Sequence, residues 1–147
     1  MVIIDKRKSL TKRLKKAKNI FIMAHKDLDL DALGSSIGMY VILKNKKKNC
    51  FLVIDDTKHE LGVEKILKEL DGFLTIIKSS EVDKNLHKKD SKNLLLILDT
   101  NKKDLVQSDS VLKKIKNKIV EKFQVRCYIG NRWENVFLCA EKFLEKF

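Results

Sequence analysis

Residues 19–43 read NIFIMAHKDLDLDALGSSIGMYVIL, and this stretch predicts a strand, a polar turn and a helix in that order. The run Asn19 to Ala24 is short and almost continuously apolar, as in strands that are buried on both faces of a parallel sheet. From Asp31 to Leu43, apolar residues recur at helical spacing with small residues among them. We therefore expect a helix that packs closely on the sheet and begins at an aspartate cap.

The same alternation continues along the chain. Further strand-like apolar runs lie at Cys50–Ile54, Phe73–Ile77, Asn93–Asp99 and, more weakly, Lys118–Val120. Helical patterns cover Leu61–Leu70 and Ser108–Lys116, and the polar stretch Ser79–Lys92 fits a short helix or a loop. Strands that alternate with helices in this way form right-handed βαβ units. The predicted fold is therefore α/β and Rossmann-like: a mostly parallel sheet with flanking helices, in which Ile20–Ala24 lies beside Leu94–Leu98.

The length of 147 residues suits a single domain over 1–147, and no linker divides it, since Pro is absent and Gly occurs five times. The first 18 residues fit an amphipathic helix with a basic polar face, which could cover the core or dock on a partner. The tail over 121–147 predicts a strand at Phe123–Ile129 and an amphipathic helix at Glu134–Phe147.

Charge and composition exclude several classes of protein. The net charge of +12 comes almost wholly from Lys, which favours a solvated basic surface over an evolved polyanion site and argues against nucleic acid as a partner. No apolar run approaches the roughly 18 residues of a membrane span, and the first residues are too charged for a signal peptide, so we expect a cytoplasmic protein. The three Cys residues lack CxxC spacing, which argues against a disulfide framework or a structural zinc site.

Side chains that can bind a metal ion, one imidazole and several carboxylates, follow two of the predicted strands. His25, Asp29 and Asp31 come after the first strand, and Asp99 ends the run Asn93–Asp99. If these strands are neighbours, the four side chains meet at the carboxyl edge of the sheet, where ligands of open α/β sheets bind. Carboxylates repel one another there unless a cation intervenes, and oxygen-rich ligation with one imidazole suits Mn²⁺, or Mg²⁺, better than Zn²⁺. The alternative is a solvated acidic turn that caps a helix.

The segment His25 to Ser35, HKDLDLDALGS, resembles the first motif of the DHH phosphoesterases, in which H-x-x-x-D-x-D-[AS]-x-G follows a strand. Residues 20–40, 51–55 and 95–106 are similar in particular to the catalytic domain of bacterial cyclic-di-AMP phosphodiesterases. The resemblance covers about residues 19–120. It implies a metal-dependent hydrolase that converts a cyclic dinucleotide, or another small phosphodiester, to a linear product.

The resemblance also implies roles for the four side chains. His25 and Asp29 would hold one Mn²⁺, Asp31 would help to hold a second, and Asp99 would bridge the pair. Two such ions lower the pKa of a bound water and neutralise charge that develops on the phosphate. By this resemblance Asp31 and Asp99 are the catalytic residues, and all four residues are metal ligands.

The chain departs from the family after residue 120. Where the family carries Asp-His-His, this sequence reads KIVEKFQV at 118–125, and the later aspartate and the second, smaller domain are also missing. His59 and His87 lie in polar stretches that match no motif and are expected to be surface residues. Two explanations remain: a truncated or frame-disrupted gene product with a foreign tail, or a divergent non-catalytic module that binds a metal, a nucleotide or a partner. Either predicts weak catalysis or none.

Overall fold

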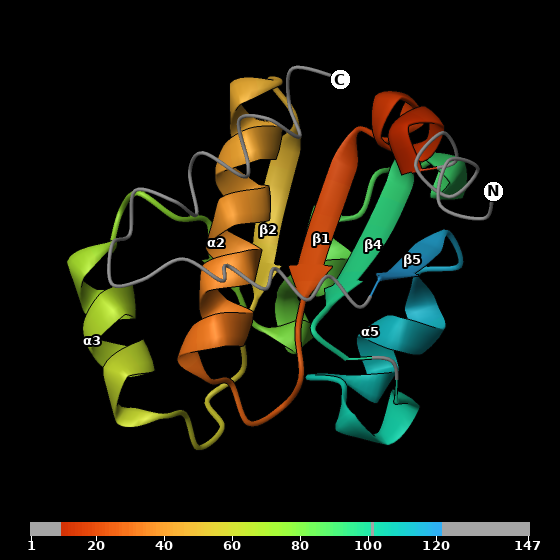
Figure 1. Cartoon of the computed structure of the whole chain (residues 1–147). Coiled ribbons are helices and arrows are strands. Elements are labelled where there is room, and N and C mark those ends of the chain that lie inside the picture. Colours follow the sequence, from red (N-terminus) through yellow and green to blue (C-terminus); the bar gives the residue numbers. More distant parts are fainter. Residues whose placement is uncertain (1–9, 101, 122–147) are drawn as a thin grey trace, which may run out of the picture.

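The computed structural model describes residues 10–100 and 102–121. Within them the chain forms a five-stranded parallel sheet in the order β3-β2-β1-β4-β5 (Figure 1). The strands are β1 (Asn19–Met23), β2 (Asn49–Val53), β3 (Ile76–Ile77), β4 (Asn93–Leu98) and β5 (Lys118–Glu121). This architecture confirms the predicted Rossmann-like α/β fold. The predicted strand and helix beyond residue 121 lie outside the described residues, and so does the part of the predicted N-terminal helix that falls on residues 1–9.

The central pair of strands is the predicted one. β1 pairs with β4 in parallel, from Asn19 opposite Asn93 to Met23 opposite Ile97. On its other side β1 pairs with β2, again in parallel. Both neighbours of β1 therefore end at the same edge of the sheet as β1 itself.

The sheet is buried on both faces because alternate side chains of each strand point to opposite sides. On one face, Ile20 and Ile22 pack with helix α2 (Leu30–Asn45), helix α3 (Leu61–Glu69) and the helix over 10–16. On the other face, Phe21 and Met23 pack with α4 (Val82–Asn85) and α5 (Asp109–Lys114). The Phe21 ring also stacks on that of Phe51, with 5.2 Å between centroids.

One boundary differs from the sequence-based expectation. The strand expected over Phe73–Ile77 is only the two-residue β3, because the turn after α3 continues to Phe73 and Leu74, whose N–H groups both donate to the carbonyl of Leu70. The polar stretch Ser79–Lys92 contains α4 between two short 3₁₀ turns, η1 (Ser79–Glu81) and η2 (Asp90–Lys92). A third such turn, η3 (Lys103–Leu105), follows β4.

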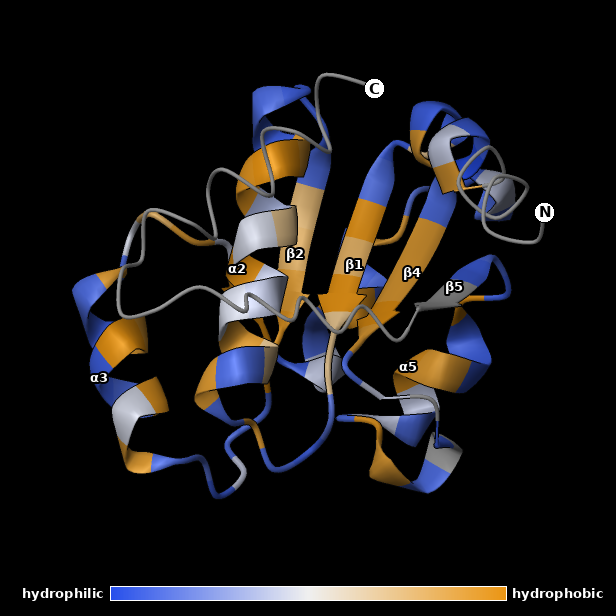
Figure 2. Ribbon diagram, viewed as in Figure 1, coloured by the Kyte–Doolittle hydropathy of each residue, from blue (hydrophilic) through white to orange (hydrophobic). Residues whose placement is uncertain are grey.

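Hydropathy follows this layering, since the strands are apolar along most of their length and the turns at both ends of the sheet are polar (Figure 2). Among the residues that the structure describes, no helix is both long and apolar enough to span a bilayer.

Candidate metal centre at the carboxyl edge of the sheet

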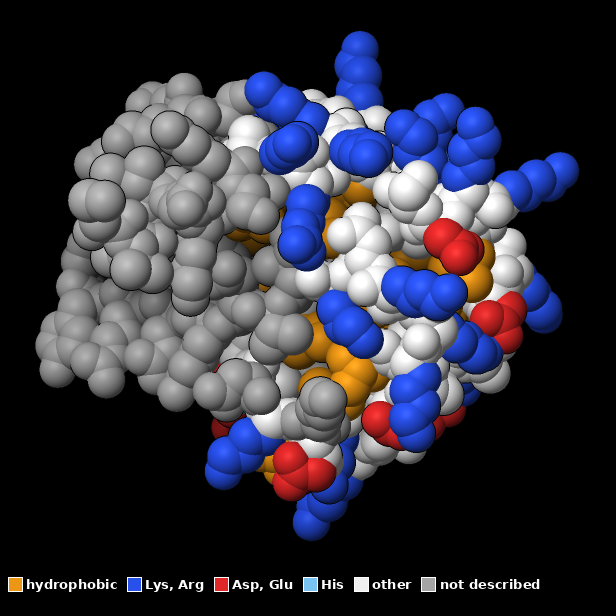
Figure 3. Space-filling view, turned by 90° about the vertical axis from the view of Figure 1, so that its right-hand side faces the viewer, with side chains coloured by type: hydrophobic (Ala, Val, Ile, Leu, Met, Phe, Trp, Pro, Cys, Tyr) orange, Lys and Arg blue, Asp and Glu red, His pale blue; other side chains and the backbone are white. Residues whose placement is uncertain are grey.

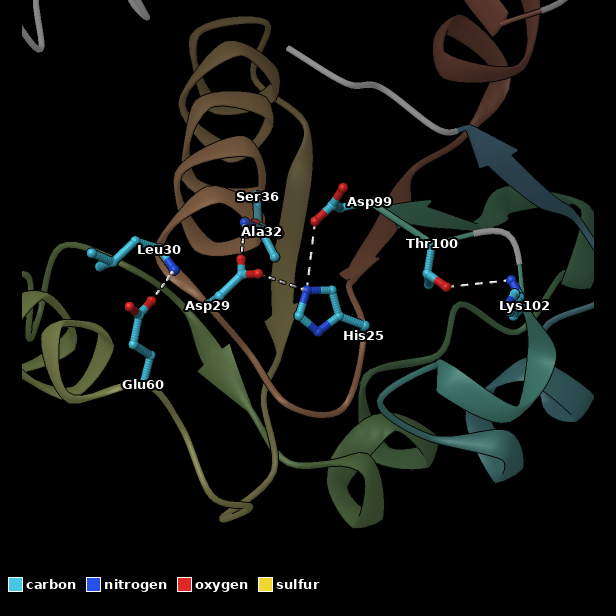
Figure 4. Close-up of polar contacts among 9 residues, drawn as sticks. All are labelled: His25, Asp29, Leu30, Ala32, Ser36, Glu60, Asp99, Thr100 and Lys102. Carbon is cyan, nitrogen blue, oxygen red and sulfur yellow. Dashed lines mark hydrogen bonds and ion pairs between the residues drawn. The ribbon is translucent and has the colours of Figure 1, made fainter. Parts of the chain in front are cut away.

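Two adjacent strands bring His25 and Asp99 together. Because Met23 is opposite Ile97, the residues two positions further along, His25 and Asp99, come level just beyond the strand ends. The His25 Nε2 atom lies 3.5 Å from Asp99 Oδ2 (Figure 4). Both side chains are mostly buried, at 19% and 18% exposure. The carboxyl edge of the sheet therefore forms half of the predicted cluster directly from strand register.

The turn after β1 supplies the third member. Asp29 is the N-cap of α2, and its Oδ1 accepts a hydrogen bond of 2.8 Å from the N–H of Ala32. Its other oxygen, Oδ2, lies 3.4 Å from His25 Nε2. The capping bond satisfies a helix N–H that has no partner within the helix, and it also fixes the direction of the carboxylate. One side chain thus starts the helix and faces the imidazole.

Asp99 is held in an unusual backbone conformation. Its φ is +57°, in the left-handed region that non-glycine residues adopt at a cost of about 1–2 kcal/mol. Aspartate is one of the residues that tolerate this region best. Backbone strain of this kind is concentrated at functional sites, and here it turns the chain just where β4 ends.

The segment after Asp99 folds back along the turn that carries His25. His25 forms an antiparallel bridge with Val106, the N–H of Lys26 donates to the Leu105 carbonyl at 2.8 Å, and the N–H of Gln107 donates to the Ala24 carbonyl at 2.9 Å. These backbone bonds lock the two site-bearing turns together, so the separation of His25 from Asp99 is set by main-chain contacts as well as by side chains.

A third turn, after β2, supports the site from the other side. Thr57 Oγ1 donates to the Lys26 carbonyl at 2.8 Å, and Glu60 Oε2 accepts from the N–H of Leu30 at 3.0 Å. In the amide orientation that satisfies both of its neighbours, buried Gln107 donates to the His25 carbonyl and accepts from the Asp55 N–H, both at 3.2 Å. The sequence-based prediction missed Glu60, Thr57 and Gln107. No sequence motif identifies a residue whose side chain forms a hydrogen bond with a backbone group of another turn.

The predicted fourth member lies apart from the other three. Asp31 is exposed in the first turn of α2. Within the described residues, the group of side chains able to share one cation consists of His25, Asp29 and Asp99, whose donor atoms all lie within 4.8 Å of one another. The structure therefore brings three of the four predicted residues together and leaves Asp31 on the adjoining helix turn.

The donor set of these three residues fits a divalent cation. Donor atoms on one such ion are separated by roughly 3–4 Å when each bond is about 2.1 Å, and the two contacts of His25 Nε2 measure 3.4 and 3.5 Å. The two carboxylates are hard ligands and the imidazole is of intermediate hardness, a combination that suits divalent cations of the same character. The Asp29 side chain is 48% exposed, so water can reach the same place. The residues could therefore hold one ion with open coordination positions.

The fold and this site define a class: an α/β domain whose parallel sheet carries, at its carboxyl edge, three side chains able to hold a metal ion. The model of the DHH family, N-terminal domain, matches residues 19–122. The chain belongs to the DHH family, whose members are metal-dependent phosphoesterases.

Two curated relatives share the matched region. The cyclic-di-AMP phosphodiesterase PdeA of Listeria monocytogenes is 26% identical over 113 residues, which cover 76% of this chain and 17% of the relative. The cyclic-di-AMP phosphodiesterase GdpP of Geobacillus thermodenitrificans is 30% identical over 108 residues, covering 71% of this chain and 16% of the relative. The chain thus matches about a sixth of the length of these proteins.

A solved structure supports the fold. An exopolyphosphatase-related protein from Bacteroides fragilis superposes with a TM-score of 0.65 at 20% sequence identity, over 95% of this chain and 43% of that chain. At this identity the likeness bears on architecture alone. It agrees with the parallel sheet and flanking helices described above.

Proposed function

We propose that this chain is a phosphodiesterase domain that binds Mn²⁺, or Mg²⁺ in its place, through His25, Asp29 and Asp99, and acts on a cyclic dinucleotide, with cyclic di-AMP as the first candidate. The observation that carries the proposal is the convergence of one imidazole and two carboxylates within 4.8 Å at the carboxyl edge of the sheet. The choice of substrate rests on the names of the two curated relatives.

Each side chain has a distinct part in this proposal. His25 would hold the ion through Nε2, and Asp29 would hold it through Oδ2 while Oδ1 keeps the helix cap. Asp99 faces the same Nε2 from the neighbouring strand and would share in holding the ion, and Asp31, in the first turn of α2, would help to hold a second one. Bound divalent ions supply an activated water and neutralise phosphate charge.

Turnover is expected to be low. The matched region ends at residue 122, and the sequence carries no Asp-His-His segment; the three His residues are His25, His59 and His87. By the resemblance that segment holds the second ion, which would be bound weakly without it, and two-metal hydrolysis needs both ions. This observation favours a second candidate function, a module that binds a metal and a nucleotide without cleaving it.

Two measurements on the full chain test the proposal. Adding Mn²⁺ should raise the melting temperature, because a ligand that binds only the native state stabilises it by mass action. Incubation with cyclic di-AMP and Mn²⁺, followed by chromatography for the linear product, should give turnover well below roughly 1 s⁻¹, the lower end of the common enzyme range.

The outcomes separate the alternatives. A melting temperature that does not change with Mn²⁺ or Mg²⁺ contradicts the metal centre. Metal binding with nucleotide binding but no linear product supports the non-catalytic module over the phosphodiesterase. Turnover of about 1 s⁻¹ or more would mean that residues 122–147 contribute replacement ligands.

A further inference from the structure

The amino end of the sheet, opposite the candidate metal centre, is lined with lysines. Residues 15–18, 44–49, 87–92 and 115–118 lead into β1, β2, β4 and β5, and together they carry twelve lysines and a single acidic residue, Asp90. We call these lysines the basic edge: Lys15, Lys16, Lys18, Lys44, Lys46, Lys47, Lys48, Lys88, Lys89, Lys92, Lys116 and Lys118. In Figure 3, Lys and Arg side chains lie along the upper rim of the face in view, and further down this face Lys and Arg side chains alternate with Asp and Glu.

Backbone bonds hold three of these segments side by side. The N–H of Lys18 donates to the Lys92 carbonyl at 2.8 Å, and the N–H of Asn49 donates to the Lys18 carbonyl at 3.3 Å. The Lys48 Nζ atom donates to the carbonyls of Lys15 and Ala17 at 2.9 and 2.8 Å, which fastens the end of the helix over 10–16 to the α2–β2 turn. The backbones of these three segments therefore form one continuous rim.

These charges are not neutralised within the described residues. The lysines that form ion pairs there are Lys78, Lys113 and Lys114, and none of them belongs to the basic edge. Burial and the charge of Lys92 both lower the pKa of Lys48, although Cys50 opposes them. Like charges crowded on one rim are unfavourable for folding unless an external anion compensates them.

Lys47 adds an independent observation. Its φ is +56°, and the N–H groups of Lys47 and Lys48 bond back to the carbonyls of Lys44 and Leu43 at 2.8 and 3.0 Å, closing the end of α2. Glycine is the usual residue at this position of a helix end, because a side chain is strained there. Lys47 thus keeps a charged side chain on the basic edge at a position where glycine would relieve the strain.

We propose that the basic edge docks on a bilayer surface that carries anionic phospholipids. Lysine is a compact, strongly hydrated point charge, which suits a diffuse layer of lipid headgroups, whereas phosphate recognition in nucleic acids favours the arginine fork. The four segments contain no Phe, Tyr or Trp, so they offer no surface for base stacking. Arg13 lies at this edge too, and its Nη1 donates to the Lys118 carbonyl at 2.9 Å, which occupies part of its guanidinium. Docking in this orientation leaves the candidate metal centre, at the other end of the sheet, facing the solution.

Vesicle binding by the full chain tests this docking. We expect cosedimentation with vesicles of phosphatidylcholine containing roughly one third phosphatidylglycerol at about 0.15 M salt, and none with phosphatidylcholine alone. The triple variant Lys16→Gln, Lys46→Gln, Lys89→Gln should bind roughly 100-fold more weakly, since each lysine near such a surface contributes about fivefold.

The matched control removes the same charge elsewhere. Three exposed lysines lie outside the basic edge: Lys58, Lys65 and Lys102. Replacing all three by Gln should change the vesicle affinity by less than about threefold, because charges further from the membrane than the Debye length of about 8 Å are screened by salt. Equal losses in both triple variants would overturn the proposal. Binding of single-stranded RNA at the same salt, without vesicle binding, would also overturn it.

Lys47→Gly separates docking from folding. This variant should raise the melting temperature, because glycine relieves the positive φ, yet weaken vesicle binding by about fivefold. A more stable variant with unchanged vesicle affinity would contradict a role for Lys47 in docking.

Discussion

The two ends of the sheet carry opposite charges. Acidic side chains follow the carboxyl ends of β1, β2 and β4, at Asp27, Asp29, Asp31, Asp55, Asp56 and Asp99. Lysines precede the amino ends of β1, β2, β4 and β5. In a parallel sheet every strand ends at the same edge, so residues that are far apart in sequence add their charges there. A charge placed before or after a strand thus decides which end of the molecule it joins.

The two ends also differ in how their side chains are arranged. At the carboxyl edge His25 contacts two carboxylates, and the group points inward to one place. At the amino end the lysines form no ion pair among the described residues. Converging acidic groups suit a small cation, whereas a rim of like charges suits an extended anionic surface.

The largest effect is expected for Asp99→Asn at the carboxyl edge. The change removes one of the two carboxylates that face His25. The affinity for Mn²⁺, measured by calorimetry, should fall by more than about 100-fold, because losing a residue that only supports a ligand already costs about 10- to 100-fold. Asp104→Asn is the control, because Asp104 is exposed in the same connection and lies outside the triad. Equal affinities of wild type and Asp99→Asn would remove Asp99 from the site.

A smaller effect is expected for Glu60→Ala. Glu60 accepts from the N–H of Leu30, next to Asp29, and so positions a ligand without being one. Mn²⁺ affinity should fall about 10-fold, as for other outer-sphere partners. Glu64→Ala removes the same charge from the exposed surface of α3 and should leave the affinity unchanged, whereas equal losses would indicate a general charge effect.

The cap and ligand roles of Asp29 can be separated by two substitutions. Both Asp29→Asn and Asp29→Ala should abolish its part in metal binding, but only Ala removes the bond to the Ala32 N–H. In urea denaturation without metal, Asp29→Ala should lose about 1 kcal/mol of unfolding free energy and Asp29→Asn only a few tenths. Identical losses for the two variants would contradict the capping role.

The smallest effect concerns Cys50, which lies beneath the basic edge. Burial raises the pKa of the Cys50 thiol to about 12, although the charges of Lys44 and Lys48 act to lower it. In the unfolded chain the thiol loses its proton near the ordinary pKa of 9.0, whereas in the native protein it keeps the proton up to about pH 12. The contribution of Cys50 to the free energy of unfolding is therefore complete below pH 9.0 and is lost as the pH rises toward about 12.

The thiol should accordingly resist modification. In a variant with Cys127→Ser and Cys139→Ser, a thiol reagent at about pH 8 should react with Cys50 only at the rate of unfolding. Fast reaction in the native state would mean that the charges of Lys44 and Lys48, and not burial, determine the pKa of the Cys50 thiol.

Much of the fold could be predicted from local pattern. The apolar runs identified β1, β2 and β4, and the adjacency of β1 and β4 is confirmed by their register. The aspartate cap of α2 is Asp29, with Asp31 in the first turn, although the sequence pattern placed the helix start at Asp31. Only two residues of the run Phe73–Ile77 form β3, because an apolar run does not reveal where the preceding helical turn ends.

The sequence by itself determined that His25, Asp29 and Asp99 follow buried strands, since strand ends and polar residues are both local features of the chain. Only the tertiary structure decided that these three meet while Asp31 stays on the exposed turn of α2. It also decided that the side chains of Glu60, Thr57 and Gln107 form hydrogen bonds with backbone groups of the turn that carries His25 and Asp29. Such contacts depend on strand order and on how connections fold back, and both follow from packing of the whole sheet rather than from the spacing of residues along the chain.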